Sequence, residues 1–557
     1  MTWDQGLELR VDDDVALRAD VWRPAGGGRH PALLIRQPYG RRGAEDITYA
    51  LPAWYARHGF AVVSQDSRGR WGSDGPFTPF ECEGDDGAAT VEWVASQPWC
   101  DGNVAMYGFS YAGATQLQAA VRRPAALKAI APVMTSADYY EGWTYKNGAF
   151  SLAFNASWAT NLLADVAHRR GDGALQQALV RQFIASPSEY DQLPLTEYPN
   201  LGRGELGSFF QDWLEHETKD EYWARWDVTE QLGDIEAEAL VVAGLYDVFL
   251  DSTLRVHERL AARRGSGTTL VLAPWYHIPW GRQVGAFDFG PEARNIVDQL
   301  QLEYFSRVLR GDDTPEQPAV KAFVTGRNSW ASFEQWPPPG DTLRLYLHGT
   351  RANSVNGDGL LSDEPPSAEA PDMYSYDPAF PVQSLGGRSC CFPFVAPMGG
   401  AEQSDVEINN GVLVYTSEPL PRDVLVAGDV RITLYAATSE ADTDWVVRLC
   451  DVTEYGQSYN IGEDVQRARF SRGTDASRPI PAGEVTRFDL GTPCCHLFKA
   501  GHRIRLHVTS SAFPLWDRNL NTGRPVGTES LADRKVALQT VHHDADAPSC
   551  ISLPVLG

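Results

Sequence analysis

The chain has 557 residues, more than one hydrophobic core usually organises, so several domains are expected. Its 43% apolar and 22% charged residues are typical of folded protein rather than of disorder. The formal net charge of −25 repels phosphate backbones, and no basic stripe opposes it, which speaks against nucleic-acid binding.

Membrane association and export are also not indicated. No apolar run approaches the ~20 residues that a membrane-spanning helix needs. The first residues, MTWDQGLELRVDDD, lack both the cationic start and the apolar stretch of a secretory signal. We therefore expect a cytoplasmic protein with no membrane partner, and the sequence leaves a homodimer open.

The eight cysteines do not have the spacing of a metal site, and no metal or other cofactor is predicted. The pairs 390–391 and 494–495 are adjacent and lack the two-residue gap of zinc knuckles. In a cytoplasmic protein we expect reduced, buried thiols. The alternative is a disulfide in the C-terminal region, where six of the eight cysteines lie.

The first 135 residues alternate between strand-like and helix-like stretches. Short apolar runs of strand length are separated by runs rich in helix formers, and this alternation predicts a parallel sheet covered on both faces. The strand-like runs are 31–36, 60–66, 104–108 and 126–133.

Residues 136–232 change character. They are dense in Trp, Tyr, Ala and charged residues and show no clear strand, which predicts a helical insertion. The alternation resumes over 233–335, with strand-like runs at 239–244 and 269–274. The simplest account is one α/β domain, 1–135 and 233–335, interrupted by a helical cap at 136–232.

The third region, 336–557, begins at the Pro-rich stretch WPPPGD, which is typical of a domain boundary. Beyond it, short β-rich runs alternate with clusters of Gly, Pro, Asn and Asp. This pattern predicts an all-β sandwich of the jelly-roll kind.

The sharpest local motif is Gly-Phe-Ser-Tyr-Ala-Gly around Ser110. A predicted strand runs into the serine and a helix leaves directly after it, as in a nucleophile elbow. Such a turn needs a strained backbone and small neighbours, which Gly108, Ala112 and Gly113 supply. The usual elbow has Gly where Ala112 stands, so this is a variant.

A serine nucleophile needs a base and an acid that orients it, and in this fold both follow later strands, the acid first. Asp247 follows the run 239–244, and His277 follows the run 269–274. Each of the three residues alone has an ordinary explanation as a cap, turn or packing residue. Because all three occur in the required order, they predict the triad Ser110, Asp247 and His277. The adjacent His542 and His543 are expected at the surface rather than as a metal pair.

The chain resembles the cocaine esterase-like and X-Pro dipeptidyl-peptidase-like serine hydrolases over almost its whole length. Ala273 stands where Gly is common in that family. The segments that carry the resemblance are 37–39, 65–70, 73–75, 90–93, 108–111, 244–247, 273–277 and 356–362.

The resemblance implies an α/β-hydrolase domain, a helical cap and a C-terminal jelly roll. It also implies an oxyanion hole made of the Tyr39 hydroxyl and the Tyr111 backbone N–H. The mechanism would be acyl transfer through Ser110 without a cofactor.

The substrate is expected to be a small-molecule ester or amide. Four cap aromatics could line its acyl group or simply form the cap core: Tyr139, Tyr140, Trp143 and Trp158. Rival activities are an X-Pro dipeptidyl aminopeptidase and a β-lactam or amino-acid ester acylase. A rival of another class is a carbohydrate-binding module whose hydrolase domain no longer works.

Overall fold

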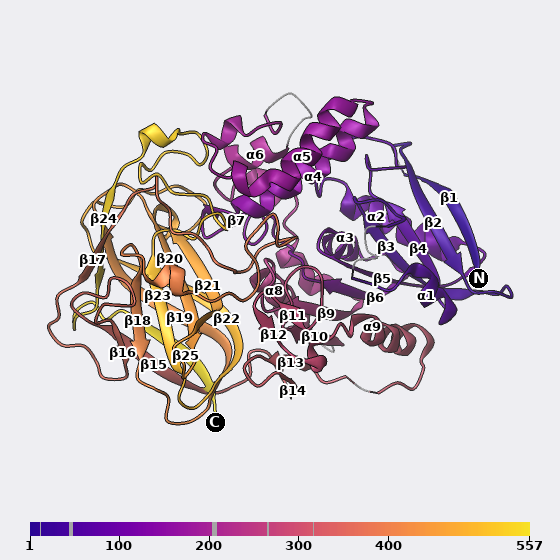
Figure 1. The fold of residues 1–557 in the computed structure, drawn as a ribbon. Helices are drawn as coiled ribbons and strands as arrows, with labels where there is room; N and C mark the ends of the chain where they lie inside the picture. Colours follow the sequence, from indigo (N-terminus) through magenta and orange to yellow (C-terminus); the bar gives the residue numbers. More distant parts are fainter. Residues whose placement is uncertain (12, 44–47, 203–208, 264–266, 316) are drawn as a thin grey trace.

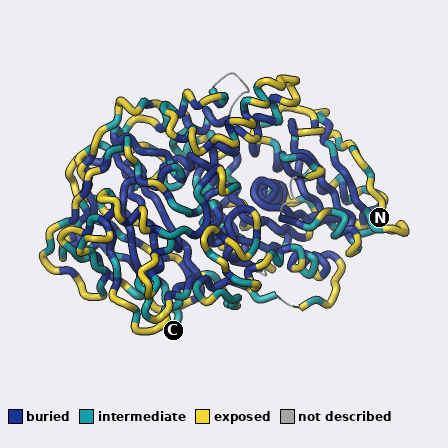
Figure 2. The backbone as a smooth tube through the Cα atoms, viewed as in Figure 1, coloured by how far each residue is buried: buried dark blue, intermediate teal, exposed yellow. Residues whose placement is uncertain are grey.

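The computed structural model describes residues 1–557 except 12, 44–47, 203–208, 264–266 and 316. Two large sheets form separate bodies, and a group of helices lies above both of them (Figure 1). The backbone of the sheets is mostly buried, and the exposed stretches are mainly on the outer loops and rims (Figure 2). Of the helices that the structure describes, none has an apolar stretch of membrane-crossing length.

The N-terminal sheet has ten strands in the order β1-β2-β4-β3-β5-β6-β9-β10-β13-β14. Its neighbours from β4 to β13 are parallel, and the outer pairs are antiparallel. This confirms the predicted parallel sheet. The strands are β1 (Thr2–Arg10), β2 (Ala16–Arg23), β3 (His30–Gln37), β4 (Ala61–Asp66), β5 (Cys100–Phe109), β6 (Leu127–Val133), β9 (Glu238–Gly244), β10 (Thr268–Ala273), β13 (Val320–Val324) and β14 (Ser329–Phe333).

Helices cover both faces of this sheet, which is why its central strands are near-continuous apolar runs. One hydrophobic cluster joins the sheet to α2 (Glu83–Ser96), α3 (Tyr111–Ala120) and α8 (Leu250–Ala261). A second cluster joins the opposite face to α1 (Pro52–Arg57) and α9 (Val297–Phe305). The first sheet is therefore the centre of an α/β domain with helices on both faces.

The segment predicted as a cap is helical, with one short hairpin that the sequence did not indicate. Its residues share an aromatic cluster with the end of the sheet where β5 and β9 finish. The elements are β7 (Tyr145–Lys146), β8 (Ala149–Phe150), α4 (Leu152–Arg169), α5 (Gly173–Glu189), η2 (Leu195–Glu197), α6 (Phe209–Glu215), α7 (Glu221–Ala224) and η3 (Thr229–Asp234).

The C-terminal domain is built on an eleven-stranded sheet system, almost entirely antiparallel, with one short α-helix, α10 (Ser404–Glu407), and two 3-10 turns, η6 (Ala468–Phe470) and η7 (Leu531–Asp533). Its longest pairing joins β19 to β22 around a separate hydrophobic core. The strands are β15 (Asp341–His348), β16 (Leu360–Ser362), β17 (Asp372–Tyr376), β18 (Leu413–Ser417), β19 (Val424–Thr438), β20 (Asp444–Val452), β21 (Ser458–Arg467), β22 (Thr486–Phe498), β23 (Arg503–Thr509), β24 (Ala537–His542) and β25 (Cys550–Leu556).

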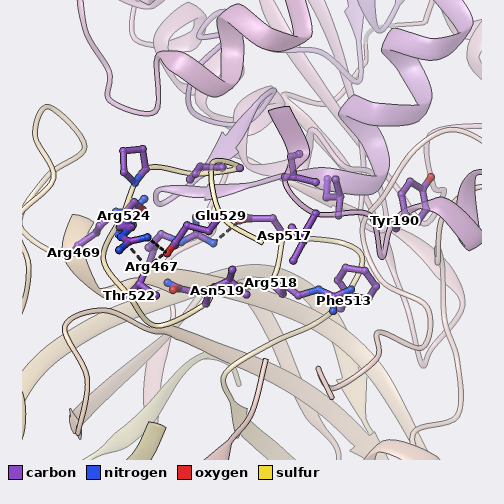
Figure 3. A pocket seen from close by; sticks show the side chains of 17 residues that line it. Tyr190, Arg467, Arg469, Phe513, Asp517, Arg518, Asn519, Thr522, Arg524 and Glu529 are labelled. Atoms are coloured by element: carbon purple, nitrogen blue, oxygen red, sulfur yellow. Dashed lines mark hydrogen bonds and ion pairs between the residues drawn. The ribbon is translucent and has the colours of Figure 1, made fainter. Parts of the chain in front are cut away.

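A cavity lies where the cap meets the C-terminal domain, and several arginines line it (Figure 3). Each guanidinium faces carboxylates: Arg467 bonds Asp444 at 2.9 Å, and Arg469 bonds Glu217 of the cap at 2.7 Å. Because these arginines are already paired with carboxylates, we interpret the cavity as part of the contact between the cap and the C-terminal domain rather than as an anion site.

Two expectations about particular side chains are wrong. Cys390 and Cys391 are joined by a disulfide instead of being reduced thiols. His543 is buried, not at the surface, and its Nε2 is 3.0 Å from Asp372. A carboxylate from a distant strand offsets the cost of burying the His543 imidazole, and the sequence around His543 does not indicate this pairing.

Candidate active site

Ser110 occupies the turn between β5 and α3, and its backbone is strained. Its φ is 59° and its ψ is −124°, a conformation that non-glycine residues rarely adopt. A Cβ on Gly108 would lie 2.6 Å from the Ala112 Cβ, and one on Gly113 would lie 2.7 Å from the Thr135 Cβ. The small residues are therefore required by close approach of strand, helix and loop, as the motif predicted.

Backbone contacts hold Ser110 without using its side chain. The Ser110 N–H donates to the Val133 carbonyl at 2.9 Å, and the Thr135 hydroxyl donates to the Ser110 carbonyl at 2.8 Å. Ser110 is the N-cap of α3, yet its hydroxyl makes no capping hydrogen bond. The hydroxyl thus remains available for chemistry at the end of the sheet.

Asp247 and His277 come together just past the ends of the neighbouring strands β9 and β10. The His277 Nδ1 lies 2.7 Å from the Asp247 Oδ1, and both side chains are almost completely buried. The second Asp247 oxygen accepts the Phe249 N–H at 3.1 Å. With Nδ1 engaged, the His277 Nε2 is the nitrogen left to exchange a proton.

Contacts on either side of the imidazole link His277 to the serine turn. The ring of Phe109, the residue before Ser110, lies 5.3 Å from the His277 ring, centroid to centroid. The Phe249 ring packs on it at the same distance, edge to face. The His277 carbonyl accepts the Trp280 indole N–H at 2.8 Å. The three predicted residues therefore lie at one end of one sheet.

Tyr39 follows β3, the strand next to β5, and its hydroxyl oxygen accepts the Trp158 indole N–H at 2.9 Å. Arg70, which is buried, donates to the Pro38 carbonyl at 2.8 Å and so fixes the turn that carries Tyr39. Burial lowers the pKa of Arg70, and Asp165 opposes that shift.

Tyr111 is the first residue of α3, so its N–H is one of the helix-start donors with no acceptor inside the helix. Its phenol points elsewhere: it donates to Glu83 at 3.0 Å and accepts the Phe80 N–H at 2.9 Å. Burial, followed by the negative Glu83, raises the pKa of Tyr111 well above its usual value. The Tyr111 phenol is therefore occupied by partners inside the protein, and the role of its backbone N–H stays a prediction.

The four cap aromatics belong to one cluster, but they differ in what they touch. Trp158 contacts Tyr39, and Trp143 stacks on Phe249, which packs on His277. Tyr139 stacks on Phe80 at 3.6 Å between centroids.

Tyr140 packs inside the cap. It lies between Tyr145 and Trp223, and its hydroxyl donates to the Glu217 carbonyl at 2.8 Å. This packing disfavours substrate contact by Tyr140. Substrate contact by Tyr139, Trp143 and Trp158 stays a prediction.

Two carboxylates near the predicted oxyanion residues, the buried Glu83 and the half-buried Asp165, are paired with arginines. Glu83, which bonds the Tyr111 phenol, lies 2.7 Å from the Arg36 guanidinium. Asp165 lies 3.4 Å from the Arg70 guanidinium. Neither carboxylate offers an uncompensated negative charge to a substrate ammonium group.

The structure adds residues that the sequence analysis did not single out. Phe249 and Phe109 enclose the imidazole, and Arg70 supports Tyr39. The C-terminal domain also reaches the site, because Ser389 forms a parallel backbone bridge with Asp247. The adjacent cysteines after Ser389 were a visible signal, but only the fold shows what they lie beside.

Comparison with known proteins matches both parts of the chain. Residues 13–279 match the X-Pro dipeptidyl-peptidase (S15 family), and residues 314–552 match the X-Pro dipeptidyl-peptidase C-terminal non-catalytic domain. The cocaine esterase of a Rhodococcus species is 34% identical over 562 residues, which cover 98% of this chain and 97% of that protein.

Two solved structures share the fold over 100% of this chain, each with a TM-score of 0.82 and 24% identity. One is an aminopeptidase from a Thaumarchaeota archaeon, of which 96% is covered, and the other is an α-amino acid ester hydrolase, of which 97% is covered.

Proposed function

Because the chain belongs to the X-Pro dipeptidyl-peptidase (S15) family, whose similar members include a cocaine esterase, it is a serine hydrolase of ester or amide bonds, and we propose that Ser110, Asp247 and His277 carry out the reaction. The observation that supports this assignment most strongly is the 2.7 Å contact between Asp247 and His277 at the sheet end where the strained Ser110 turn lies. Three chain segments, which follow β5, β9 and β10, meet at this end of the sheet.

In the first step, the Ser110 oxygen attacks the acyl carbonyl while its proton passes to the His277 Nε2. Asp247 holds the imidazole by Nδ1 and stabilises the imidazolium. The tetrahedral intermediate then collapses, the bond to the leaving group breaks, and His277 returns the proton to that group. In the second step, water attacks the acyl-serine with the same base, which releases the acid and restores the Ser110 hydroxyl.

The oxyanion is proposed to lie between the Tyr39 hydroxyl and the Tyr111 backbone N–H. The Trp158 N–H donates to the Tyr39 oxygen and so orients the phenol. The hydrogen bond from such a donor becomes stronger as negative charge develops on the substrate oxygen. Trp158 acts here as a positioning residue.

For the substrate, we propose an ester with an uncharged, apolar acyl group. The cap contributes an apolar, aromatic wall in which Trp158 and Trp143 come nearest to Tyr39 and to the residues around His277. The nearby carboxylates, Glu83 and Asp165, are neutralised by arginines. An ester of an aromatic or branched aliphatic acid fits these surroundings better than a substrate with a free amine.

A fluorophosphonate probe tests the nucleophile, since it labels only an activated serine. We expect one label per chain, located at Ser110 by peptide mass spectrometry, and none in Ser110→Ala. The control variant Ser96→Ala removes an exposed hydroxyl that donates to the Trp93 carbonyl, and it should label normally. Labelling that persists in Ser110→Ala would overturn the assignment of Ser110, and absence of labelling in the wild type would favour the non-catalytic carbohydrate-binding module.

The main rival is cleavage after proline, which also fits the family. That activity requires an anchor for the substrate's free amine, which the neutralised Glu83 and Asp165 do not supply. We expect kcat/KM for a p-nitrophenyl ester of a neutral acid to exceed that for a glycyl-prolyl p-nitroanilide by at least about 10². The reverse preference would assign the chain as an aminopeptidase.

A further inference from the structure

A pair of adjacent cysteines from the C-terminal domain lies beside the proposed general base. The sulfur atoms of Cys390 and Cys391 and a ring nitrogen of His277 all lie within 4.8 Å of one another. Cys390 is fully buried, and Cys391 is half-buried between the cap cluster and the sheet cluster. Two thiols and an imidazole are a ligand set that Zn²⁺ and similar soft cations prefer.

The segment that carries the cysteines is held firmly against the α/β domain. Arg388 donates to the Leu245 carbonyl at 3.0 Å and to the Thr492 hydroxyl at 2.6 Å. Ser389 bridges the backbone of Asp247, the partner of His277. Just beyond the pair, the Val395 carbonyl accepts the Tyr190 hydroxyl at 2.6 Å. The sulfurs are therefore placed by contacts on both sides.

We propose that Cys390, Cys391 and His277 form an inhibitory site for a thiophilic divalent cation such as Zn²⁺, which exists only when the two cysteines are reduced. Reduction by a dithiol or phosphine breaks the S–S bond with two electrons and two protons and yields two thiols. The cation then binds both sulfurs as thiolates and releases two protons. Oxidation of the pair abolishes the site.

The imidazole nitrogen available to the cation is the one that catalysis needs. Asp247 engages the His277 Nδ1 at 2.7 Å, which leaves Nε2 to bind either a proton or the metal ion. Ligand atoms around tetrahedral zinc lie about 3.5 Å apart, so a shift of about 1 Å, with the opened sulfurs separating, would collect all three. A bound cation would hold His277 away from the Ser110 proton and stop hydrolysis.

A second cluster in the C-terminal domain shows what distinguishes this site. Glu407, Cys450 and His507 also have ligand atoms within 4.8 Å of one another. There the carboxylate is already paired with the Arg505 guanidinium, and its other oxygen is 2.9 Å from the His507 Nε2. A cation would have to displace that arginine, whereas no arginine pairs with the ligand atoms of the Cys390–Cys391 site among the described residues.

The test measures metal binding as well as activity, because the inhibition, unlike the binding, rests on the proposed function. The full-length chain is reduced with a phosphine, desalted without oxygen, and titrated with Zn²⁺ or Cd²⁺. We expect one cation per reduced chain, a Cd²⁺–thiolate absorption band, and loss of at least about nine-tenths of esterase activity. The oxidised chain should show none of these.

Variants separate the two proposals. Ser110→Ala should bind Cd²⁺ like the wild type although it is inactive, so binding can be judged even if the proposed triad fails. Cys391→Ser and His277→Gln should each weaken Cd²⁺ binding about tenfold or more. The control Cys550→Ser, a half-buried thiol in β25, should bind and respond like the wild type.

The double variant Cys390→Ser/Cys391→Ser guards against a fold defect in a single variant. After its folding is confirmed by thermal unfolding, it should keep its own metal-free activity in the presence of Zn²⁺. The proposal is overturned if reduced wild type binds Cd²⁺ no better than this double variant. A disulfide that stays closed under reductant in the folded chain also overturns it.

Discussion

Replacing Tyr39 by Phe tests the oxyanion assignment, because it removes one hydroxyl and keeps the ring. If that hydroxyl stabilises the transition state, kcat should fall by about 10²–10³, which corresponds to about 2.7–4 kcal/mol. The hydroxyl also accepts the Trp158 indole N–H at 2.9 Å, and Trp158 is 5% exposed. Its loss leaves a buried donor unpaired, so folding stability should fall by about 1–3 kcal/mol.

A double-mutant cycle separates these two effects. Trp158→Phe removes the indole donor, and in Tyr39→Phe/Trp158→Phe no unpaired donor remains. Stability should therefore recover relative to Tyr39→Phe, whereas kcat should stay low. Steady-state hydrolysis of an aryl ester gives kcat and KM, and urea unfolding gives stability. A folded Tyr39→Phe whose kcat is within about threefold of wild type would refute the oxyanion role.

Three further changes test the acid of the proposed triad, the packing of the Ser110 turn, and the effect of the buried His257 on stability at low pH. Asp247→Asn keeps the size of the side chain but favours the wrong tautomer of the imidazole, so kcat should fall by about 10⁴ with little change in thermal unfolding; a fall below about tenfold would contradict the triad. Gly113→Ala brings a Cβ to 2.7 Å from the Thr135 Cβ, so the free energy of unfolding measured in urea should fall by about 1–3 kcal/mol. In the control Gly173→Ala the new Cβ meets nothing within 4 Å, so stability should be unchanged or slightly higher. Burial lowers the pKa of His257 to about 4 from 6.5, so the unfolded chain takes up a proton between these values that the folded chain does not. This group should therefore lower stability by up to about 3 kcal/mol as the pH drops from about 6.5 to about 4, and urea unfolding at the two pH values should show this loss in the wild type relative to His257→Leu.

The sequence predicted the first sheet well because its strands are buried on both faces. The run 239–244 is apolar throughout and the run 60–66 begins with four apolar residues, and the corresponding strands, β9 and β4, are buried along almost their whole length. The edge strand β1 was not singled out, because its residues are mostly exposed and lack such a run. The predicted runs correspond to the six central strands β3, β4, β5, β6, β9 and β10, whereas the mostly buried β2 and β13 were missed as well as β1.

The pairing of polar groups could not be predicted in the same way. His543 was expected at the surface, yet Asp372 from a distant part of the chain makes its burial possible. Arg70 was not singled out either, although its bond to the Pro38 carbonyl positions the turn that carries Tyr39. Such pairs depend on contacts between segments far apart in the chain, and neither partner has a local signature.

The order Ser110, Asp247, His277 and the strand before each of them were enough, by themselves, to predict a candidate triad at one edge of a parallel sheet. The reason is that parallel strands bring their carboxyl ends to one edge whatever connects them. Only the tertiary structure placed Cys390 and Cys391 beside His277. That contact brings a loop of the C-terminal domain to the α/β domain. Hydrophobic periodicity predicts single elements, and it does not predict which residues of two domains meet.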